Sequence, residues 1–134
     1  MLGQFNHPRT VLLGGIRALG ALPVCDHYCG TETTIRKSLA LQNELAAEYG
    51  RCVMDVTLDC EDGAPVGAEV DHAQMVAEIA RSVVDGVVDG ALGMRVAVRV
   101  HPVGHFAFEQ DIALLFGAYR DRPRAFCHVM LPKV

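Results

Sequence analysis

Three carboxylates stand close together in the stretch VTLDCEDGAP at residues 56–65, namely Asp59, Glu61 and Asp62. They follow an apolar run and precede a glycine. Acids gathered in this way can bind a cation, order water or transfer a proton. A purely local explanation also exists, because Asp and Gly both favour turns at the end of a strand. Other reactive side chains that reach the same place would favour an active-site edge over a turn.

Arg99 is the strongest candidate for such a partner, because it lies in the middle of the apolar stretch RVAVRVHPV at residues 95–103. A strand alternates its side chains, so three valines share one side and Arg95, Ala97, Arg99 and His101 share the other. An arginine inside a covered strand must find a partner or line a cavity. Adjacent strands lie about 4.8 Å apart, so both a structural ion pair and a substrate-binding cation predict that Arg99 lies near the acids.

The cysteines form a second group with possible chemistry, and the stretch CDHYC at residues 25–29 contains two thiols and an imidazole. A structural zinc site is one interpretation, although no second cysteine pair stands at zinc-finger spacing. In a chain without an export signal, we expect reduced cysteines that are mostly buried as small apolar groups. The five cysteines are Cys25, Cys29, Cys52, Cys60 and Cys127.

The composition predicts one soluble globular domain, since the chain has 134 residues of which 51% are hydrophobic and 21% charged. Its apolar stretches fall short of the roughly 20 residues that span a bilayer, and MLGQFNHPRT lacks a secretory pattern. We therefore predict a cytoplasmic protein with no membrane partner. A net charge of −4 argues against a nucleic-acid partner.

Two hydrophobic periods alternate along the chain after an N-terminal extension at residues 1–20. Strands are predicted at 21–28, 52–60, 95–103 and 125–134, and helices at 31–50, 71–88 and 108–120. The first helix has a Ser/Thr-rich start, an apolar spacing of Ile35, Leu39, Leu41 and Leu45, and Gly50 at its end. This alternation predicts an α/β fold of parallel β/α units with right-handed crossovers.

Parallel sheets bind their ligands at the carboxyl ends of the strands, which is where the three acids are expected. The chain ends in LPKV on a predicted strand. Four β/α units cannot close an eight-stranded barrel, which takes about 250 residues. Two architectures stay open: a small open-sheet domain, or the first half of a (β/α)8 TIM barrel. Among the histidines, His72 and His105 are expected at exposed positions and His128 on a buried face.

Three ordered motifs resemble the citrate lyase beta-subunit and malyl-CoA lyase family of the HpcH/HpaI aldolase superfamily. They are LDCED at residues 58–62, VRVH at 98–101 and PKV at 132–134, with AR at 80–81 between the first two. The resemblance covers residues 50–134. Cys60 replaces a leucine of the family pattern, and His101 replaces an asparagine.

The resemblance implies a (β/α)8 barrel and a carbon–carbon lyase of the retro-aldol or Claisen type. Its substrates would be 3-hydroxy-acyl-CoA thioesters such as citryl-, malyl- or citramalyl-CoA. It also implies a divalent cofactor, usually Mg²⁺, whose Glu and Asp ligands are expected after Val134. No direct metal ligand is therefore expected in this chain, although Glu61 or Asp62 could act through water. A homo-oligomer is expected from the family as well.

The same resemblance assigns roles to individual residues. Arg99 would bind the substrate and polarise its carbonyl oxygen, a task that suits a planar, permanently charged guanidinium. Glu61 and Asp62 would complete the catalytic set at the metal edge of the pocket, with Asp59 deeper.

Basic residues are also assigned by the resemblance. Arg36 and Lys37 are the candidates for binding the CoA phosphates, and a solvated helix face is their alternative explanation. Lys133 is expected to orient the pocket acids and not to act as a Schiff-base nucleophile.

Two other functions remain possible from the sequence. The chain could be a noncatalytic binding or assembly subunit of a larger lyase complex, because the expected metal ligands are not in it. It could also be a small α/β domain that binds a nucleotide. The second is disfavoured because no strand is followed by GxGxxG or GxxxxGKS, and LLGG at 12–15 is too generic.

Overall fold

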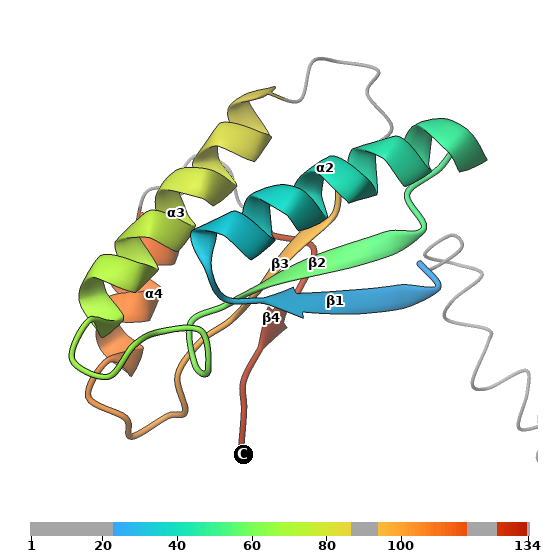
Figure 1. Cartoon of the computed structure of the whole chain (residues 1–134). Coiled ribbons are helices and arrows are strands. Elements are labelled where there is room, and N and C mark those ends of the chain that lie inside the picture. Colours follow the sequence, from blue (N-terminus) through green and yellow to red (C-terminus); the bar gives the residue numbers. More distant parts are fainter. Residues whose placement is uncertain (1–22, 87–93, 118–125, 134) are drawn as a thin grey trace, which may run out of the picture.

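A computed structural model describes residues 23–86, 94–117 and 126–133, and Figure 1 shows how these segments are arranged. The predicted N-terminal extension and the LLGG stretch lie outside the described residues. The chain alternates strands and helices in this order: β1 Cys25–Cys29, α2 Glu32–Tyr49, β2 Met54–Asp59, α3 Glu69–Gly86, β3 Val96–Arg99, α4 Phe108–Gly117 and β4 Val129–Met130.

The four strands form one parallel sheet in the order β1-β2-β3-β4. Neighbours in the sequence are therefore neighbours in the sheet, which is how consecutive β/α units follow one another in a barrel. This arrangement confirms the predicted α/β fold of parallel β/α units. The open-sheet folds that bind dinucleotides reverse their strand order at a switch point, and the described sheet has no such reversal.

Helix α2 begins and ends where the sequence predicts. Thr31 is the N-cap, and its hydroxyl accepts a hydrogen bond from the Thr34 backbone N–H at 3.2 Å. Gly50 follows the last turn with φ of 68°, a left-handed conformation that glycine adopts without a Cβ clash. Ile35 and Leu39 are buried as expected, whereas Leu41 is exposed. The prediction for Leu41 was wrong because the buried face continues through Gln42.

Gln42 is a polar residue in the middle of the buried helix face, with 1% of its surface exposed. Its Nε2 donates to the carbonyl oxygens of Met54 at 2.6 Å and Arg95 at 2.8 Å. These carbonyls lie at the amino ends of β2 and β3, and that of Arg95 also accepts the Val56 backbone N–H at 3.1 Å. The buried Gln42 amide therefore joins α2 to two neighbouring strands of the sheet.

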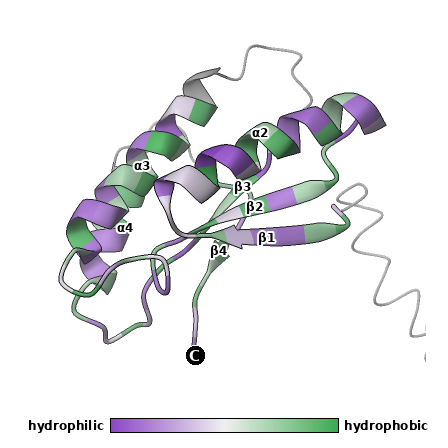
Figure 2. Ribbon diagram, in the orientation of Figure 1, coloured by the Kyte–Doolittle hydropathy of each residue, from purple (hydrophilic) through white to green (hydrophobic). Residues whose placement is uncertain are grey.

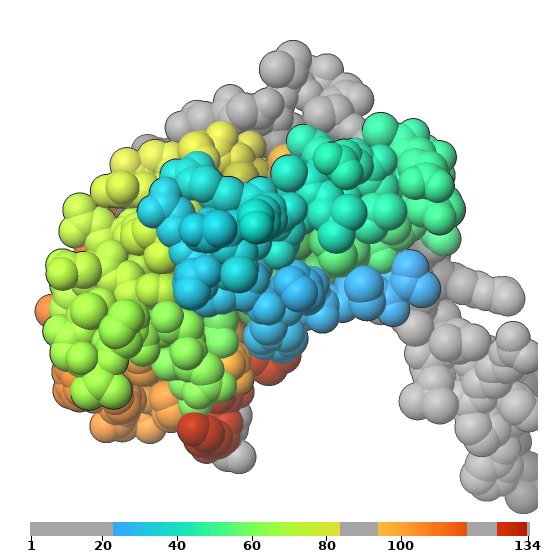
Figure 3. All heavy atoms as spheres, viewed as in Figure 1, coloured from blue at the N-terminus to red at the C-terminus, as the bar shows by residue number. Residues whose placement is uncertain are grey.

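The apolar core lies between the sheet and the helices. Alternate residues of β2 and β3 point toward α2, α3 and α4, and all three helices lie on one face of the sheet (Figure 1). The fully buried strand residues on this face are Val56, Leu58, Val98 and Val100. In the space-filling view, α2 and α3 cover most of the face turned to the viewer (Figure 3).

The other face of the sheet is polar, which the alternation of the strands requires. It presents Asp26 and Tyr28 from β1, Asp55, Thr57 and Asp59 from β2, and Arg99 from β3. Figure 2 shows hydrophilic colouring along parts of β1 and β2, next to the apolar stripes of the helices. A charged sheet face of this kind must line a pocket or form ion pairs, and both occur here.

Several predicted boundaries differ from the structure. The fourth strand is predicted at 125–134, but only Val129–Met130 pair as a strand, and their side chains remain substantially exposed. The third strand is also shorter than predicted and ends at Arg99, although the Val100 N–H still donates to the Met130 carbonyl at 3.2 Å. The predicted end of the third helix at residue 120 lies outside the described residues.

The cysteines are free, but most of them are not buried, which corrects the prediction. Cys29 and Cys60 are buried, Cys52 is half-buried, and Cys25 and Cys127 are exposed. The two exposed thiols lie at the edges of the sheet. Cys25 begins the edge strand β1, and Cys127 stands next to the short β4, where few other residues cover it. Among the described residues, none of the helices combines the length and apolar character that crossing a membrane would require.

Candidate active site

The carboxyl ends of β2 and β3 bring the predicted residues together. Asp59 is the last residue of β2 and is in register with Arg99, the last residue of β3. The chain then continues as a tight loop, and the backbone N–H of Cys60 still donates to the Arg99 carbonyl at 2.8 Å. The acids that follow β2 are therefore held beside the arginine by the sheet itself.

Arg99 binds all three acids at once. Its Nε and Nη2 donate to the two oxygens of Asp59 at 2.8 and 2.5 Å, a two-pronged ion pair. Nη1 lies 3.1 Å from Glu61 Oε2, and Nη2 lies 2.6 Å from Asp62 Oδ2. The hydrogen bonds that Arg99 donates to the acids raise its pKa, and those to Asp59 have the largest effect. The guanidinium is therefore charged at every accessible pH. The predicted proximity of Arg99 to the acids is confirmed.

Lys133 reaches the same cluster from the segment after β4. Its Nζ lies 2.7 Å from Glu61 Oε1, which places it beside the acids, as expected. The hydrogen bond that the ammonium donates to Glu61 raises the pKa of Lys133, so Lys133 stays protonated. A protonated amine cannot act as a nucleophile. Three carboxylates and two cations leave the cluster with one net negative charge.

The acids differ in exposure, and this difference separates their possible roles. The side chains of Asp59 and Glu61 are 8% and 7% exposed, whereas that of Asp62 is 72% exposed. Asp59 Oδ1 also accepts the backbone N–H of Glu61 at 3.0 Å and, less closely, that of Asp62. Asp59 therefore shapes the loop and holds Arg99 in place. Asp62 is the acid that an entering ligand can displace.

His72 packs against the loop after β2 and hydrogen-bonds the last residue of that strand. It lies in α3, is 6% exposed, and its Nε2–H donates to the Asp59 carbonyl at 2.9 Å. The prediction that His72 is exposed was wrong, because α3 begins two residues earlier than expected and its first turn packs under the loop. His105 is half-buried, and His128 is partly exposed on the polar face of the sheet, not in the core as predicted.

An open pocket of about 400 Å³ lies beside the cluster. The pocket is bounded by the end of β1, the start of α2 and the loop after β2, including Tyr28, Thr31, Asp59 and Asp62. The guanidinium carbon of Arg99 lies 5.3 Å from the centre of the Tyr28 ring, within cation–π range. Burial and then the Asp26 charge raise the pKa of Tyr28, so its hydroxyl stays a donor.

Two glycines set the rim of this pocket. A Cβ at Gly63 would overlap the Asp59 carbonyl oxygen and the Gly30 Cα, and a Cβ at Gly30 would overlap Gly63. The turn after β1 and the loop after β2 therefore touch backbone to backbone. Only two residues without side chains permit this approach.

Replacing Gly63 with Ala is expected to destabilise the folded chain by about 2 kcal/mol, because the added methyl must push two backbones apart. Chemical denaturation followed by circular dichroism measures this loss. Gly117→Ala is the matched control, since a Cβ there meets nothing within 4 Å, and it should be close to neutral. Equal effects of the two substitutions would contradict the close approach.

Arg36 and Lys37 are not drawn into this cluster. Arg36 lies on the exposed face of α2 and pairs with Glu32 at 2.8 Å, one turn earlier in the same helix. Lys37 is also exposed on α2. These positions agree with a solvated helix face. A role in binding CoA phosphates remains a proposal for them.

His101, which stands where the family pattern has an asparagine, does not contact the Arg99 cluster. Its Nδ1–H and its backbone N–H both donate to Asp111 Oδ2, at 2.7 and 2.8 Å. Both side chains are almost fully buried, and the His101 ring stacks on His105 at 4.4 Å. His101 therefore joins the end of β3 to α4. Cys60 is equally buried, and burial raises its pKa, so it is an inert thiol.

The acids do not fit as direct ligands of a divalent ion. Both oxygens of Asp59 and of Glu61 already pair with cationic side chains, and Asp62 shares one oxygen with Arg99. In the described part of the chain, CDHYC does not contribute to a group of three metal-ligating side chains. Zinc at CDHYC is thus not supported.

Sequence reasoning missed Tyr28, Gly30, Gly63 and His72 as parts of the site. Tyr28 and Gly30 could have been found from their place at the end of β1, on the edge of the sheet that carries the acids. The contact between Gly30 and Gly63 had no sequence signal. It depends on how closely two separate turns approach.

Comparison with known proteins finds similarity among solved structures. No protein-family model matches the chain, and no curated protein matches it. A crystal structure of a citrate lyase from Burkholderia xenovorans LB400 is similar, with 39% sequence identity and a TM-score of 0.63. The match covers 86% of this chain and 32% of the citrate lyase. In fold and in sequence, the chain therefore corresponds to one part of a citrate lyase, which supports a lyase-type family.

Proposed function

We propose that the chain carries the arginine site of a carbon–carbon lyase that acts on a 3-hydroxy-acyl-CoA thioester such as citryl-, malyl- or citramalyl-CoA. One observation carries this proposal: Arg99 is held by three acids at the carboxyl ends of parallel strands, beside an open pocket. The likeness to a citrate lyase supports the reaction class. The chain spans about a third of that protein, and we propose that it forms the first half of a barrel domain.

The reaction would break the bond between the hydroxyl-bearing carbon and the carbon next to the thioester. The hydroxyl gives its proton to a base and becomes a carbonyl, and the electrons of the broken carbon–carbon bond form an enolate with its charge on the thioester oxygen. The enolate carbon then takes up a proton, which gives the shorter acyl-CoA. Arg99 would donate to that oxygen, or to the substrate carboxylate, where negative charge must be stabilised. Asp59 would position the guanidinium, because its two-pronged pair fixes the plane of the donors.

Asp62 would give way to the substrate. It is largely exposed and shares Nη2 of Arg99 with Asp59, so its departure frees one donor direction toward the pocket. An incoming carboxylate or thioester oxygen could take that place without breaking the Asp59 pair. Because one anionic oxygen replaces another, Arg99 keeps a negatively charged partner during the exchange.

We propose a divalent ion, Mg²⁺ in the first place, as the cofactor of this activity. The acids of the Arg99 cluster do not fit as its direct ligands, so the ion would be held by groups outside the described residues. Glu61 or Asp62 would then act only through bound water. Such an ion supplies a positive centre for the hydroxyl and carboxylate oxygens of the substrate.

A noncatalytic binding or assembly role is the second candidate, and one observation favours it. Each of the three nitrogens of Arg99 contacts an acid, and the cluster keeps one net negative charge, which opposes an anionic substrate when no metal is present. In that role the chain would present Arg99 to a larger lyase complex. In a homo-oligomer, Arg99 would be presented to neighbouring copies of this chain instead.

Incubation of the purified chain with citryl-, malyl- and citramalyl-CoA in the presence of Mg²⁺ tests the first proposal. The expected result is release of the shorter acyl-CoA and a keto acid, seen by chromatography. Calorimetric titration with the same thioesters then separates the candidates. Binding without cleavage supports the assembly role, whereas neither binding nor cleavage contradicts both.

A further inference from the structure

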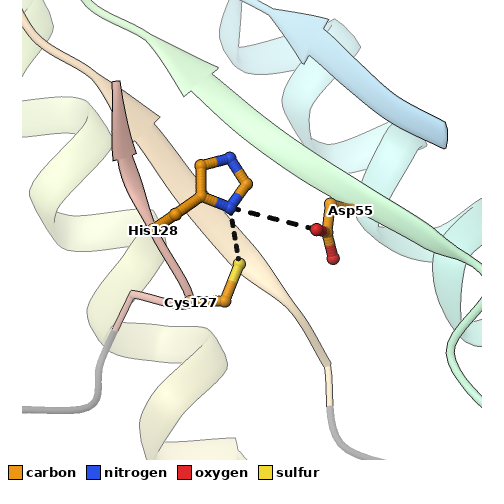
Figure 4. A group of neighbouring side chains, drawn as sticks. All are labelled: Asp55, Cys127 and His128. Carbon is orange, nitrogen blue, oxygen red and sulfur yellow. Dashed lines mark hydrogen bonds and ion pairs between the residues drawn. The ribbon is translucent and has the colours of Figure 1, made fainter. Parts of the chain in front are cut away.

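A second cluster of reactive side chains lies on the polar face of the sheet, toward the amino ends of the strands. Asp55 of β2 meets Cys127 and His128, which immediately precede β4 (Figure 4). Their ligand atoms all lie within 4.8 Å of one another. Cys127 Sγ is 3.4 Å from His128 Nδ1, and this nitrogen is 3.9 Å from Asp55 Oδ2. Proposals for the Arg99 site use none of these residues.

One of these separations matches the edge of a tetrahedral metal site, and the other two are longer, at 3.9 Å and at most 4.8 Å. Zinc binds nitrogen and oxygen at about 2.0–2.2 Å and thiolate sulfur at about 2.3 Å, so neighbouring ligand atoms lie roughly 3.3–3.7 Å apart. The sulfur–nitrogen distance already falls in this range, and the nitrogen–oxygen distance exceeds it slightly. A small movement of side chains, without a movement of the strands, would complete the three ligand positions.

The other ring nitrogen of His128 is held in the way that metal-binding histidines require. Nε2–H donates to Asp26 Oδ2 at 3.1 Å, and the Thr57 hydroxyl donates to Asp26 Oδ1 at 2.7 Å. A carboxylate can only accept, so this contact places the proton on Nε2 and leaves the Nδ1 lone pair facing Cys127 and Asp55. A carboxylate behind the histidine both orients the ring and strengthens it as a ligand.

Charge at the cluster also suits a dication. Arg95 donates to Asp55 Oδ1 at 2.6 Å and, less closely, to Oδ2 at 3.2 Å, and Oδ2 is the oxygen that faces His128. Asp59 also holds two backbone N–H groups and Glu61 pairs with two cations, whereas Asp55 would have to give up only the longer Arg95 contact. Asp26, Asp55 and a Cys127 thiolate together carry three negative charges. Arg95 offsets one of them, so a divalent ion would make the group neutral. A thiolate with an imidazole selects zinc-like ions over Mg²⁺, which prefers oxygen ligands.

We propose that Asp55, Cys127 and His128 form a site for Zn²⁺ or a similar transition-metal ion, with a fourth position open to solvent. On binding, the Cys127 S–H bond breaks, a sulfur–metal bond forms and the proton passes to solvent. The ion would tie β2 to the segment that leads into β4. The site differs from the Arg99 cluster, since Asp55 and Asp59 are four residues apart on one strand, about 13 Å.

The contacts among Cys127, His128 and Asp26 also resemble a thiol nucleophile with its base and orienting acid. An activated thiol has a lowered pKa. Here burial, with the charge of Asp55, raises the pKa of Cys127 to about 11. A raised pKa does not fit an activated nucleophile, so the contacts of Cys127 favour a ligand over a catalytic thiol.

Titration of the reduced, metal-free chain with Co²⁺ tests the site, because cobalt reports both thiolate ligation and geometry. The expected result is one equivalent of Co²⁺ with a thiolate-to-cobalt band in the near ultraviolet and tetrahedral bands in the visible, all displaced by Zn²⁺. Cys127→Ser should lose the thiolate band and weaken binding by at least about 100-fold. Asp26→Asn, which removes only the orienting acid, should weaken it about 10-fold.

Cys25→Ser is the matched control, since Cys25 is also an exposed thiol but pairs in register with Met54 on the opposite face of the sheet. This variant should bind Co²⁺ as the wild type does. Zn²⁺ should raise the melting temperature of Cys25→Ser and of the wild type, but it should not raise that of Cys127→Ser. His128→Gln provides a second ligand variant if Cys127→Ser fails to fold. Absence of the thiolate band in the wild type, or its survival in Cys127→Ser, would overturn the proposal.

Discussion

Replacing Asp59 with Asn is expected to lower the free energy of unfolding by about 3 kcal/mol, the low end of the range for breaking a buried ion pair. The value is placed there because Arg99 keeps Glu61 and Asp62 and its own side chain is 20% exposed. Asn offers one acceptor oxygen, whereas Asp59 accepts hydrogen bonds from the Arg99 fork and from two backbone N–H groups. Its amide N–H₂ would also face the guanidinium.

Urea denaturation followed by circular dichroism measures this loss, with the slope of the transition compared between variants. Asp62→Asn is the matched control, because Asp62 makes a single contact with Arg99 and its side chain is 72% exposed. That change should cost less than about 1 kcal/mol. Similar losses for Asp59→Asn and Asp62→Asn would show that the buried pair does not organise the loop after β2.

Replacing Arg99 with Lys is expected to lower kcat/KM for thioester cleavage about 100-fold, if the chain cleaves its substrate as proposed. An ammonium keeps the charge but lacks the planar fork that contacts Asp59, Glu61 and Asp62 together. The substrate oxygen would then lose an oriented donor at the moment when it becomes negative. Stability should change less than in Asp59→Asn, since the positive charge remains among the acids.

Steady-state cleavage and calorimetric binding of the same thioester, measured side by side, check this expectation. Arg51→Lys is the control, because Arg51 is exposed between α2 and β2, at the amino end of the strand, and it should retain wild-type values. Near-normal cleavage by Arg99→Lys would remove Arg99 from the reaction. Lost cleavage with unchanged binding would place its effect in the transition state.

The order of elements could be predicted from the sequence because it depends on local periodicity. Alternation by two residues marked β2 and β3, and the three- to four-residue spacing with Thr31 and Gly50 marked α2. The errors arose where tertiary contacts override local pattern. Gln42 is buried because its amide donates to two carbonyls of the sheet, and Leu41 is exposed because it lies on the outer side of α2.

The Arg99 cluster was predictable for a similar reason. Residues at the ends of neighbouring parallel strands must meet at one edge of the sheet, so Asp59 and Arg99 could be paired from their positions alone. His72 could not be placed in this way, because its contact with the Asp59 carbonyl depends on where α3 begins and how it packs. The backbone contact between Gly30 and Gly63 could not be predicted either, because it depends on how closely two separate turns approach.

By itself, the sequence determined the α/β alternation, the polar face of the sheet and the guanidinium among the acids, since each follows from spacing along one or two strands. Only the tertiary structure decided which acid holds Arg99 and which is free to leave. It also decided that Asp26, Asp55 and His128, distant in the chain, converge on the same face. The physical reason is that side-chain period is local, whereas burial and approach depend on packing between distant segments.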